Sequence, residues 1–263
     1  MKISLLIAYY KNSAALALIL QALARQTYHN FEVVIAEDDH NPETVAYLQT
    51  AVAQFAFEII HVRQTEDVGF RKNQILNKAV LAATGNYLVL IDGDCVPHPR
   101  FLATYATCAR PREALFGRRV MVSETLTTKL LQTQNLGLLS LASLWQHGSR
   151  KLKYALYLPW LNYTNQTGMW GCNWGIAKQD LLAINGFDED YIRAGVGEDV
   201  DVSWRLVTNG IIFRSVRFAA IVYHLHHRAN YDNTDVQFNF GVLAQKKAAG
   251  HIFCVNGLIK PEK

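Results

Sequence analysis

Residues 87–94 read YLVLIDGD, so that five apolar and aromatic residues pass directly into Asp92, Gly93 and Asp94. A short, nearly continuous apolar run is typical of a strand that is buried on both faces of a parallel sheet. Two carboxylates at the end of such a strand suit a hard divalent cation, and the glycine allows the backbone to turn between them. A solvated Asp-Gly turn is the alternative, but the apolar strand before the turn favours a metal site.

Strands and helices alternate in the sequence before this stretch. Apolar runs predict strands at Ile3–Tyr9, Phe31–Ala36 and Glu58–Arg63, and apolar residues at helical spacing predict helices at Ala14–Arg25, Thr44–Gln54 and Arg71–Thr84. Alternation of this length predicts an α/β fold with a mostly parallel sheet, whose ligands bind beyond the carboxyl ends of the strands. The strand-end aspartates lie at such a position.

The pattern changes after residue 115. Phe116–Ser123 is predicted to be one more strand, and the leucine-rich stretch of residues 126–161 is predicted to be a mostly helical insertion or a second subdomain. Further along, we predict a helix at Lys178–Ile184, a second helix that follows Asp199 and ends at Asn209-Gly210, and a last strand at Ala219–Tyr223. We therefore divide a single domain into two halves, residues 1–115 and residues 116–263, with no linker between them.

The composition is that of an ordinary folded protein. Half of the 263 residues are hydrophobic, 18% are charged, and the formal net charge is +4. This charge is too small to predict a nucleic-acid partner, although it suits an anionic substrate or an anionic membrane surface. The four cysteines form no C-x-x-C pair, and no apolar stretch approaches the ~20 residues of a spanning helix. We therefore expect a cytoplasmic protein, free or peripheral on the inner membrane.

Charged side chains also stand at the ends of two other predicted elements. Asp38 and Asp39 end the second strand, where a carboxylate can accept a hydrogen bond from a uracil N3–H or a ribose hydroxyl. Capping of the following turn is an equally good interpretation. Arg71 and Lys72 begin a helix, where the helix dipole adds to their own charge in binding a phosphate. A solvated first turn is the alternative, but basic residues are unusual there.

Two later segments carry groups for catalysis and metal binding. Glu198 and Asp199 precede a helix, where carboxylates are ordinary caps, but a general base for a hydroxyl must be a carboxylate or a histidine. Asp199 is our candidate for this base. His224 and His226 follow the last predicted strand, so their imidazoles are expected to lie on one side of it. One histidine beside the strand-end aspartates makes a site of mixed nitrogen and oxygen ligands that suits manganese.

Taken in order, these motifs resemble those of GT-A fold glycosyltransferases of the inverting family 2 type. The first half supplies Ala8–Ser13, Asp38-Asp39, Gly69–Asn73 and the DXD motif Asp92-Gly93-Asp94. The second half is similar to the β-1,4-galactosyltransferase and chondroitin polymerase group at Gly171–Asn173, Ile184–Glu189, Gly197–Asp201 and Arg205-Leu206. Residues 191–196 read YIRAGV and lack the tryptophan of those galactosyltransferases. The surface that stacks on the sugar is therefore expected to differ.

The resemblance implies a Rossmann-like sheet of the GT-A type, with a nucleotide-sugar-binding first half and an acceptor-binding second half that carries the base. It implies inverting transfer of a hexose or N-acetylhexosamine from a UDP-sugar to a saccharide acceptor, with Mn²⁺, or alternatively Mg²⁺, as cofactor. Asp199 would deprotonate the acceptor, and Glu198 would also face the sugars. The implied metal ligands are Asp92, Asp94 and either His224 or His226. The implied donor-binding residues are Ala8, Tyr10, Asp38, Asp39, Phe70, Arg71, Lys72, Asp92, Gly93, Asp94 and Asn173.

We predict a role in the synthesis of bacterial lipopolysaccharide, capsule or another surface polysaccharide. A nucleotidyltransferase also uses acidic residues and a metal on an α/β sheet, but residues 8–14 (AYYKNSA) contain no glycine-rich phosphate loop. A catalytically inactive sugar-binding or scaffold protein is the other alternative, and retention of every acidic position argues against it.

The leucine-rich stretch also predicts a contact with a membrane surface. It carries the basic residues Lys129, Arg150, Lys151 and Lys153 among the aromatic residues Trp145, Tyr154, Tyr157 and Trp160. Such a mixture suits a helix that lies on an anionic bilayer, which is useful if the saccharide acceptor is lipid-linked. Packing of a subdomain is the alternative.

Overall fold

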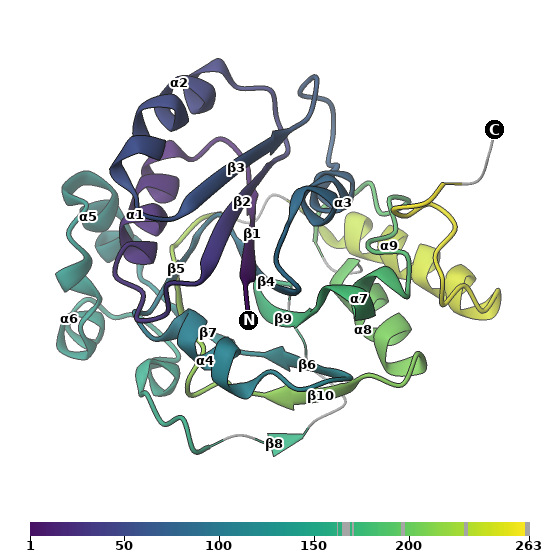
Figure 1. The fold of residues 1–263 in the computed structure, drawn as a ribbon. Helices are drawn as coiled ribbons and strands as arrows, with labels where there is room; N and C mark the ends of the chain where they lie inside the picture. The colour runs from purple at the N-terminus through teal and green to yellow at the C-terminus, as the bar shows by residue number, and fades with distance from the viewer. Residues whose placement is uncertain (162, 165–168, 170, 196–197, 229–230, 261–263) are drawn as a thin grey trace.

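Two sheets form the centre of the structure, a computed structural model that describes residues 1–161, 163–164, 169, 171–195, 198–228 and 231–260 (Figure 1). The large sheet contains β1 (Ile3–Tyr9), β2 (Phe31–Glu37), β3 (Glu58–Arg63), β4 (Tyr87–Asp92), β6 (Glu113–Phe116), β8 (Tyr163–Thr164), β9 (Asn173–Ala177) and β10 (Ile212–Ser215). The small sheet contains β5 (Cys95–Pro97), β7 (Arg118–Met121) and β11 (Ile221–His224). Their orders are β3-β2-β1-β4-β9-β6-β10-β8 and β5-β11-β7.

The N-terminal strands form a parallel unit around β1. In its register Ile7 pairs with Ile35 of β2 on one side and with Ile91 of β4 on the other. Both faces of β1 are buried, which explains its continuous apolar sequence. Beyond β4, β9 enters antiparallel between β4 and β6. The predicted α/β architecture with a mostly parallel sheet is therefore confirmed.

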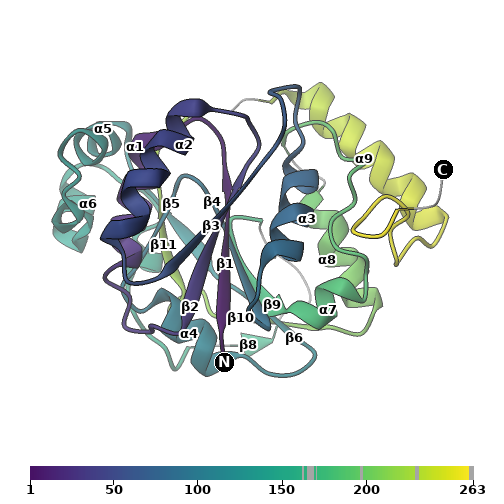
Figure 2. The same ribbon diagram turned by 45° about the horizontal axis from the view of Figure 1, so that its top comes forward.

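Helices cover both faces of the large sheet (Figures 1 and 2). They are α1 (Ser13–Leu23), α2 (Pro42–Ala51), α3 (Lys72–Ala82), α4 (Phe101–Cys108), α5 (Glu124–Thr133), α6 (Leu141–Gln146), α7 (Lys178–Leu182), α8 (Glu198–Thr208) and α9 (Asn233–Ala248), with 3₁₀ turns η1 (Val52–Gln54), η2 (Leu136–Leu139) and η3 (Leu152–Ala155). Leu5 and Ile7 of β1 belong to a core with α1, α4 and α5. Leu6 belongs to a second core with α3 and α8. Successive side chains of β1 therefore pack into the cores on opposite faces of the sheet.

The strand predicted at residues 116–123 is two strands that belong to different sheets. The chain leaves the large sheet after β6 and enters the small sheet as β7, and Gly117 lies at the crossing. The Gly117 N–H donates to the Asn173 carbonyl at 3.0 Å, and an added Cβ would lie 2.2 Å from Nδ2 of that asparagine. Any larger residue would therefore displace β9. The predicted boundary after residue 115 falls within β6 and stays a prediction.

The leucine-rich stretch folds as short pieces rather than as one long helix. α5, η2, α6 and η3 follow one another, and Gln134 and Lys151 adopt left-handed backbone conformations (φ 53° and 58°) at two of the breaks. Within the ranges that the structure describes, no helix combines the length and the apolar character needed to cross a bilayer.

Candidate active site

The Asp92-Gly93-Asp94 turn begins at the last residue of β4 and lies against the end of β1. The Gly93 N–H donates to the Ala8 carbonyl at 2.7 Å. A Cβ added to Gly93 would lie 2.9 Å from that carbonyl oxygen and 3.2 Å from Cα of Tyr9. The turn therefore requires glycine, since the backbones approach too closely for a side chain. This contact holds the two carboxylates at the carboxyl edge of the sheet.

The small sheet brings two histidines to Asp94. β11 runs antiparallel to β5 with His224 opposite Cys95, and the Leu225 N–H donates to the Asp94 carbonyl at 2.9 Å. Nε2 of His224 lies 3.3 Å from Oδ2 of Asp94, and Nε2 of His227 lies 2.9 Å from the same oxygen. One potential ligand atom from each of these three residues lies within 4.8 Å of the others. They are the one such group among the described residues.

Of the two histidines predicted as alternative metal ligands, His224 belongs to this group and His226 does not. His226 is exposed, and its backbone N–H donates to Oγ1 of Thr127 at 2.8 Å. His227 takes the place beside Asp94 because β11 ends at His224, so the chain beyond it no longer alternates as a strand does. The sequence could have indicated this residue, since His227 is the last histidine of the stretch HLHH at residues 224–227.

The electrostatics of the group suit a cation. Burial lowers the pKa of His224, so that its imidazole is neutral and able to ligate. Burial opposes ionisation of Asp94, but the hydrogen bond from His227 and the neighbouring histidines hold the pKa of this carboxyl below its ordinary value. The hydrogen bond to Asp94 raises the pKa of His227 to about 9, so that His227 must release a proton before its imidazole can ligate a metal. One carboxylate and two imidazoles form a ligand set that fits Mn²⁺.

Asp92 has a different neighbour, the first residue of α3. Nζ of Lys72 lies 2.9 Å from Oδ1 of Asp92. Lys72 also lies near Gly171, where an added Cβ would be 3.9 Å from Nζ of Lys72 and 3.5 Å from Cβ of Asp199. Residues from β4, α3, α8 and the segment before β9 therefore meet at one place.

Asp199, the candidate base, has one oxygen held and one oxygen without a partner. The Gly171 N–H donates to Oδ2 of Asp199 at 3.2 Å. Oδ1 of Asp199 is buried and accepts no hydrogen bond from any residue that the structure describes. An orphaned carboxylate oxygen beside a fixed one is suited to accept a proton. Glu198 begins α8, and its side chain lies outside the described part of the structure.

The acidic pair after β2 has structural partners. Oδ2 of Asp38 accepts the Arg71 N–H at 2.8 Å, and Oδ1 accepts from the Gln64 amide at 3.2 Å. Burial raises the pKa of Asp38 despite these bonds. Oδ1 of Asp39 accepts the following backbone N–H at 2.6 Å, and Oδ2 lies 3.9 Å from Nζ of Lys11. Asp38 thus fixes the start of α3, whereas Asp39 faces a cationic side chain.

Three further residues expected at the donor site differ in their surroundings. Tyr10 is exposed, and its hydroxyl lies 3.4 Å from Asp67. Phe70 is half-buried immediately before α3. Asn173 is only 1% exposed. Its Oδ1 accepts the Tyr105 hydroxyl at 2.6 Å, while its Nδ2 donates to two backbone carbonyls. Asn173 therefore ties the two sheets together and is not brought to the site.

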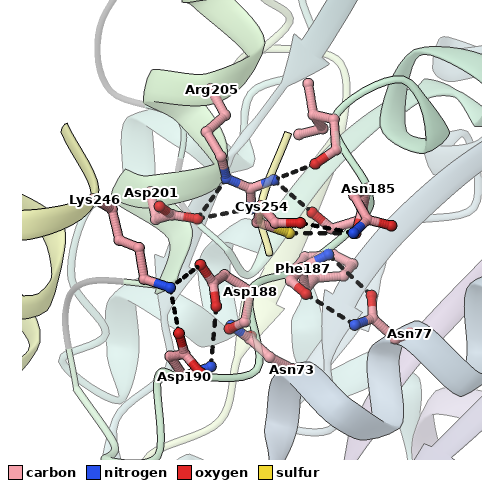
Figure 3. A network of polar contacts seen from close by, with 12 residues as sticks. Asn73, Asn77, Asn185, Phe187, Asp188, Asp190, Asp201, Arg205, Lys246 and Cys254 are labelled. Atoms are coloured by element: carbon pink, nitrogen blue, oxygen red, sulfur yellow. Dashed lines mark hydrogen bonds and ion pairs between the residues drawn. The ribbon is translucent and has the colours of Figure 1, made fainter. Parts of the chain in front are cut away.

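A buried polar network connects α3 to the loop before α8 (Figure 3). Nδ2 of Asn73 donates to the Asp188 carbonyl at 2.7 Å. One helical turn later, Asn77 donates to the Phe187 carbonyl at 2.8 Å and accepts the Phe187 N–H at 2.9 Å. Lys246 of α9 forms an ion pair with Asp188 at 2.9 Å. The i, i+4 spacing of the two asparagines was the available sequence signal for this connection.

Arg205 fixes α8 to the same loop. Its Nε donates to Oδ2 of Asp201 at 2.7 Å, and its Nη1 donates to the carbonyls of Ile184 and Gly186, each at 2.8 Å (Figure 3). The guanidinium is fully buried, so this ion pair has no access to water. Because α3 carries Lys72 and α8 carries Asp199, the network sets the position of one relative to the other.

Comparison with known proteins gives two family matches. The family described as glycosyl transferase family 2 matches residues 4–179. A second one, described as the N-terminal domain of galactosyltransferase, matches residues 154–228. Together they include Lys72, Asp92, Asp94, Asp199 and the two histidines beside Asp94.

The curated relatives are bacterial polysaccharide synthases. The chain is 26% identical over 253 residues to a chondroitin synthase of Escherichia coli, covering 89% of this chain and 36% of that protein. It is 22% identical over 253 residues to a hyaluronan synthase of Pasteurella multocida, covering 89% of this chain and 25% of that protein. The chain thus spans between a quarter and about a third of the length of these relatives.

Solved structures with the same fold confirm the GT-A architecture. GalNAc-T7 with UDP, GalNAc and Mn²⁺ superposes with a TM-score of 0.68 at 12% identity, covering 93% of this chain and 47% of that one. S. aureus TarS 1-349 in complex with UDP gives a TM-score of 0.63 at 15% identity, covering 96% and 70%. The mannosyltransferase PcManGT from Pyrobaculum calidifontis, with GDP-Man and Mn²⁺, gives 0.58 at 17% identity, covering 95% and 62%.

Proposed function

Because the chain belongs to glycosyl transferase family 2, we propose that it transfers a hexose or an N-acetylhexosamine from a UDP-sugar to a saccharide acceptor, with inversion at the anomeric carbon. The observation that carries this proposal is the meeting of Asp94 and its two histidines with Lys72, Asp92 and Asp199 at the carboxyl edge of the sheet. Ligands of open α/β sheets bind at this edge.

We assign the metal ligands to Asp94, His224 and His227, and the preferred ion to Mn²⁺, with Mg²⁺ as the weaker candidate. The donor set supports this assignment, since imidazole nitrogens suit manganese better than magnesium. Two of the solved structures with this fold contain Mn²⁺ beside a nucleotide or nucleotide sugar. When bound, the cation neutralises charge on the departing diphosphate.

The remaining groups of the site bind the diphosphate and deprotonate the acceptor in a single displacement. Lys72 supplies a positive charge beside Asp92, where it can hold the diphosphate. Oδ1 of Asp199 takes the proton of the acceptor hydroxyl, and the hydroxyl oxygen forms a bond to the anomeric carbon. The bond from that carbon to the UDP oxygen breaks as the new one forms. Because attack and departure occur on opposite faces, the configuration inverts.

For the biological role, we propose synthesis of a bacterial capsule, lipopolysaccharide or other surface polysaccharide. The relatives that support this role are a chondroitin synthase and a hyaluronan synthase from bacteria. A polysaccharide chain is accordingly the acceptor that we propose, either free or linked to a lipid.

The test of this function is a transfer assay with product analysis. The chain is incubated with Mn²⁺, a panel of UDP-hexoses and UDP-N-acetylhexosamines, and oligosaccharides of chondroitin and hyaluronan. We expect one donor to lengthen an acceptor by a single sugar in mass spectra, with a new linkage of inverted configuration by NMR. Binding of UDP-sugars without any product would favour the inactive sugar-binding protein. A product with retained configuration would overturn the single displacement in which Asp199 acts as the base.

A further inference from the structure

One segment of the chain carries an excess of positive charge equal to the net charge of the whole chain. Residues 125–161 carry four basic residues and no aspartate or glutamate, although the chain as a whole contains 22 acidic residues. These four positive charges equal the formal net charge of the entire chain, which is +4. The basic residues are Lys129, Arg150, Lys151 and Lys153, and all four are exposed. The segment therefore presents a surface of one sign to solvent.

The same segment exposes large apolar side chains at defined positions. Leu141 and Trp145 stand four residues apart on α6, hence on one helix face, and are 45% and 75% exposed. Leu144, between them in sequence, is fully buried and anchors the helix in the main core. Beyond η3, Leu156 is also exposed, and Trp160 is 71% exposed. We call Leu141, Trp145 and Leu156 the α6 surface.

A hollow lies beside the α6 surface. Its volume is about 410 Å³, and its walls include Leu136, Leu139, Leu141 and Ala155, with Tyr223 and Arg25. Leu141 thus belongs both to the wall of the hollow and to the exposed face of α6. An apolar hollow next to an exposed tryptophan can receive part of a lipid acyl chain.

We propose that the α6 surface docks on a bilayer that contains anionic phospholipids, with Leu141 and Trp145 inserted at the level of the headgroups. Charge complementarity selects this partner, because the surrounding residues are basic and acidic residues are absent from the segment. Tryptophan prefers the membrane interface, where its ring is buried and its N–H stays hydrated. The helix is already folded and packed, so docking does not require ordering of the chain.

α6 lies away from two of the helices that contribute to the proposed active site. In both views α5 and α6 lie on the flank beside α1, whereas α3, α8 and α9 lie on the opposite flank (Figures 1 and 2). A bilayer on the α6 flank therefore does not cover the helices that carry Lys72 and Asp199.

The experiment is sedimentation of the full chain with vesicles of phosphatidylcholine alone, or of phosphatidylcholine mixed with phosphatidylglycerol. We expect binding to the anionic vesicles at low salt, release in about 1 M NaCl, and little binding to neutral vesicles. Leu141→Ala combined with Trp145→Ala should lower the affinity for anionic vesicles about tenfold or more. The matched control is Leu81→Ala on α3, since Leu81 is 64% exposed on the opposite flank and should leave binding unchanged.

Charge and insertion are tested separately. Arg150→Glu with Lys153→Glu should abolish the salt-sensitive binding, whereas Arg110→Glu, an exposed arginine outside the segment, should weaken it far less. In vesicles with brominated acyl chains, tryptophan fluorescence should be quenched, and Trp145→Phe should remove most of the quenching. Trp204→Phe is the control, because Trp204 belongs to α8 on the opposite flank and should leave the quenching unchanged. Unfolding temperatures confirm that the variants remain folded.

Three results would overturn the inference: equal binding to neutral and anionic vesicles, wild-type binding by the Leu141 and Trp145 double variant, or recovery of the chain in the supernatant with every vesicle. None of them depends on the proposed function, because vesicle binding is measured without donor or acceptor. Conversely, the double variant should transfer sugar to a soluble acceptor in lipid-free buffer at the wild-type rate.

Discussion

Nε2 of His227 lies 2.9 Å from Oδ2 of Asp94, whereas the adjacent His226 lies outside the group of potential metal ligands. The two neighbouring histidines therefore form a matched pair for testing the metal site. His227→Ala should weaken binding of UDP in the presence of Mn²⁺ by about 10- to 100-fold, since a ligand to the cation is lost. His226→Ala should change the affinity by less than about twofold. Isothermal titration calorimetry measures both, and the reverse order of effects would assign the site to His226.

Asp199→Asn should retain donor binding and lose transfer. The amide keeps the shape of the side chain and can still accept the Gly171 N–H, but it cannot take a proton. We expect kcat to fall by about 10²- to 10⁴-fold with little change in the affinity for UDP. Steady-state kinetics and calorimetry on the same preparation separate the two quantities. Turnover at the wild-type rate would exclude Asp199 as the base.

Arg205→Ala should destabilise the fold. The substitution leaves Asp201 buried without its partner and removes the donors to the carbonyls of Ile184 and Gly186. Breaking a buried pair in this way costs about 3–5 kcal/mol in the free energy of unfolding, which corresponds to a Tm lower by roughly 10 °C. Arg205→Lys should recover only part of this loss, because lysine has no planar fork. Arg110→Ala, at an exposed position, is the control, and an equal Tm for both alanine variants would contradict the prediction.

Glu32 should make stability sensitive to acid. Burial alone would raise the pKa of this carboxyl, but hydrogen bonds from Lys2, Thr84 and Ser4 lower it to about 2. Because the folded-state pKa is depressed, the stabilisation by ionised Glu32 is present above pH ~4.5 and is lost as the pH falls towards ~2. In urea titrations across this range, the free energy of unfolding should therefore fall more steeply with decreasing pH for the wild type than for Glu32→Gln.

The control for this effect is Glu58, which is also near Lys2 but is exposed. Glu58→Gln should leave the pH dependence close to that of the wild type, because an ion pair of an exposed carboxylate contributes little to stability. Parallel pH profiles for the wild type and Glu32→Gln would show that Glu32 does not carry the acid sensitivity.

The N-terminal half was predictable because its pattern is local. β1 and β3 have the predicted bounds, and β2 and β4 each extend one residue further, since strands buried on both faces read as continuous apolar runs. The helices between them also follow from apolar spacing. The α/β class and the strand-end position of Asp92 and Asp94 depend on this local pattern alone.

The small sheet was not predictable in the same way. β5 and β7 are three and four residues long, and their pairing with β11 joins parts of the chain that are more than 100 residues apart. This long-range pairing decides which histidine reaches Asp94, so the choice between His226 and His227 required the structure. The buried amides of Asn73 and Asn77 were missed for the same reason, because their partners lie in a distant loop.

The most direct test of the central claim is acceptor-dependent release of UDP from a UDP-sugar, measured with Mn²⁺ and again with EDTA, for the wild type and Asp94→Asn. Our account predicts release by the wild type with Mn²⁺, restored by Mn²⁺ after EDTA treatment, and a rate lower by at least about 10²-fold for Asp94→Asn in any condition. Equal release with EDTA, or wild-type release by Asp94→Asn, would contradict a metal-dependent glycosyltransferase centred on this aspartate.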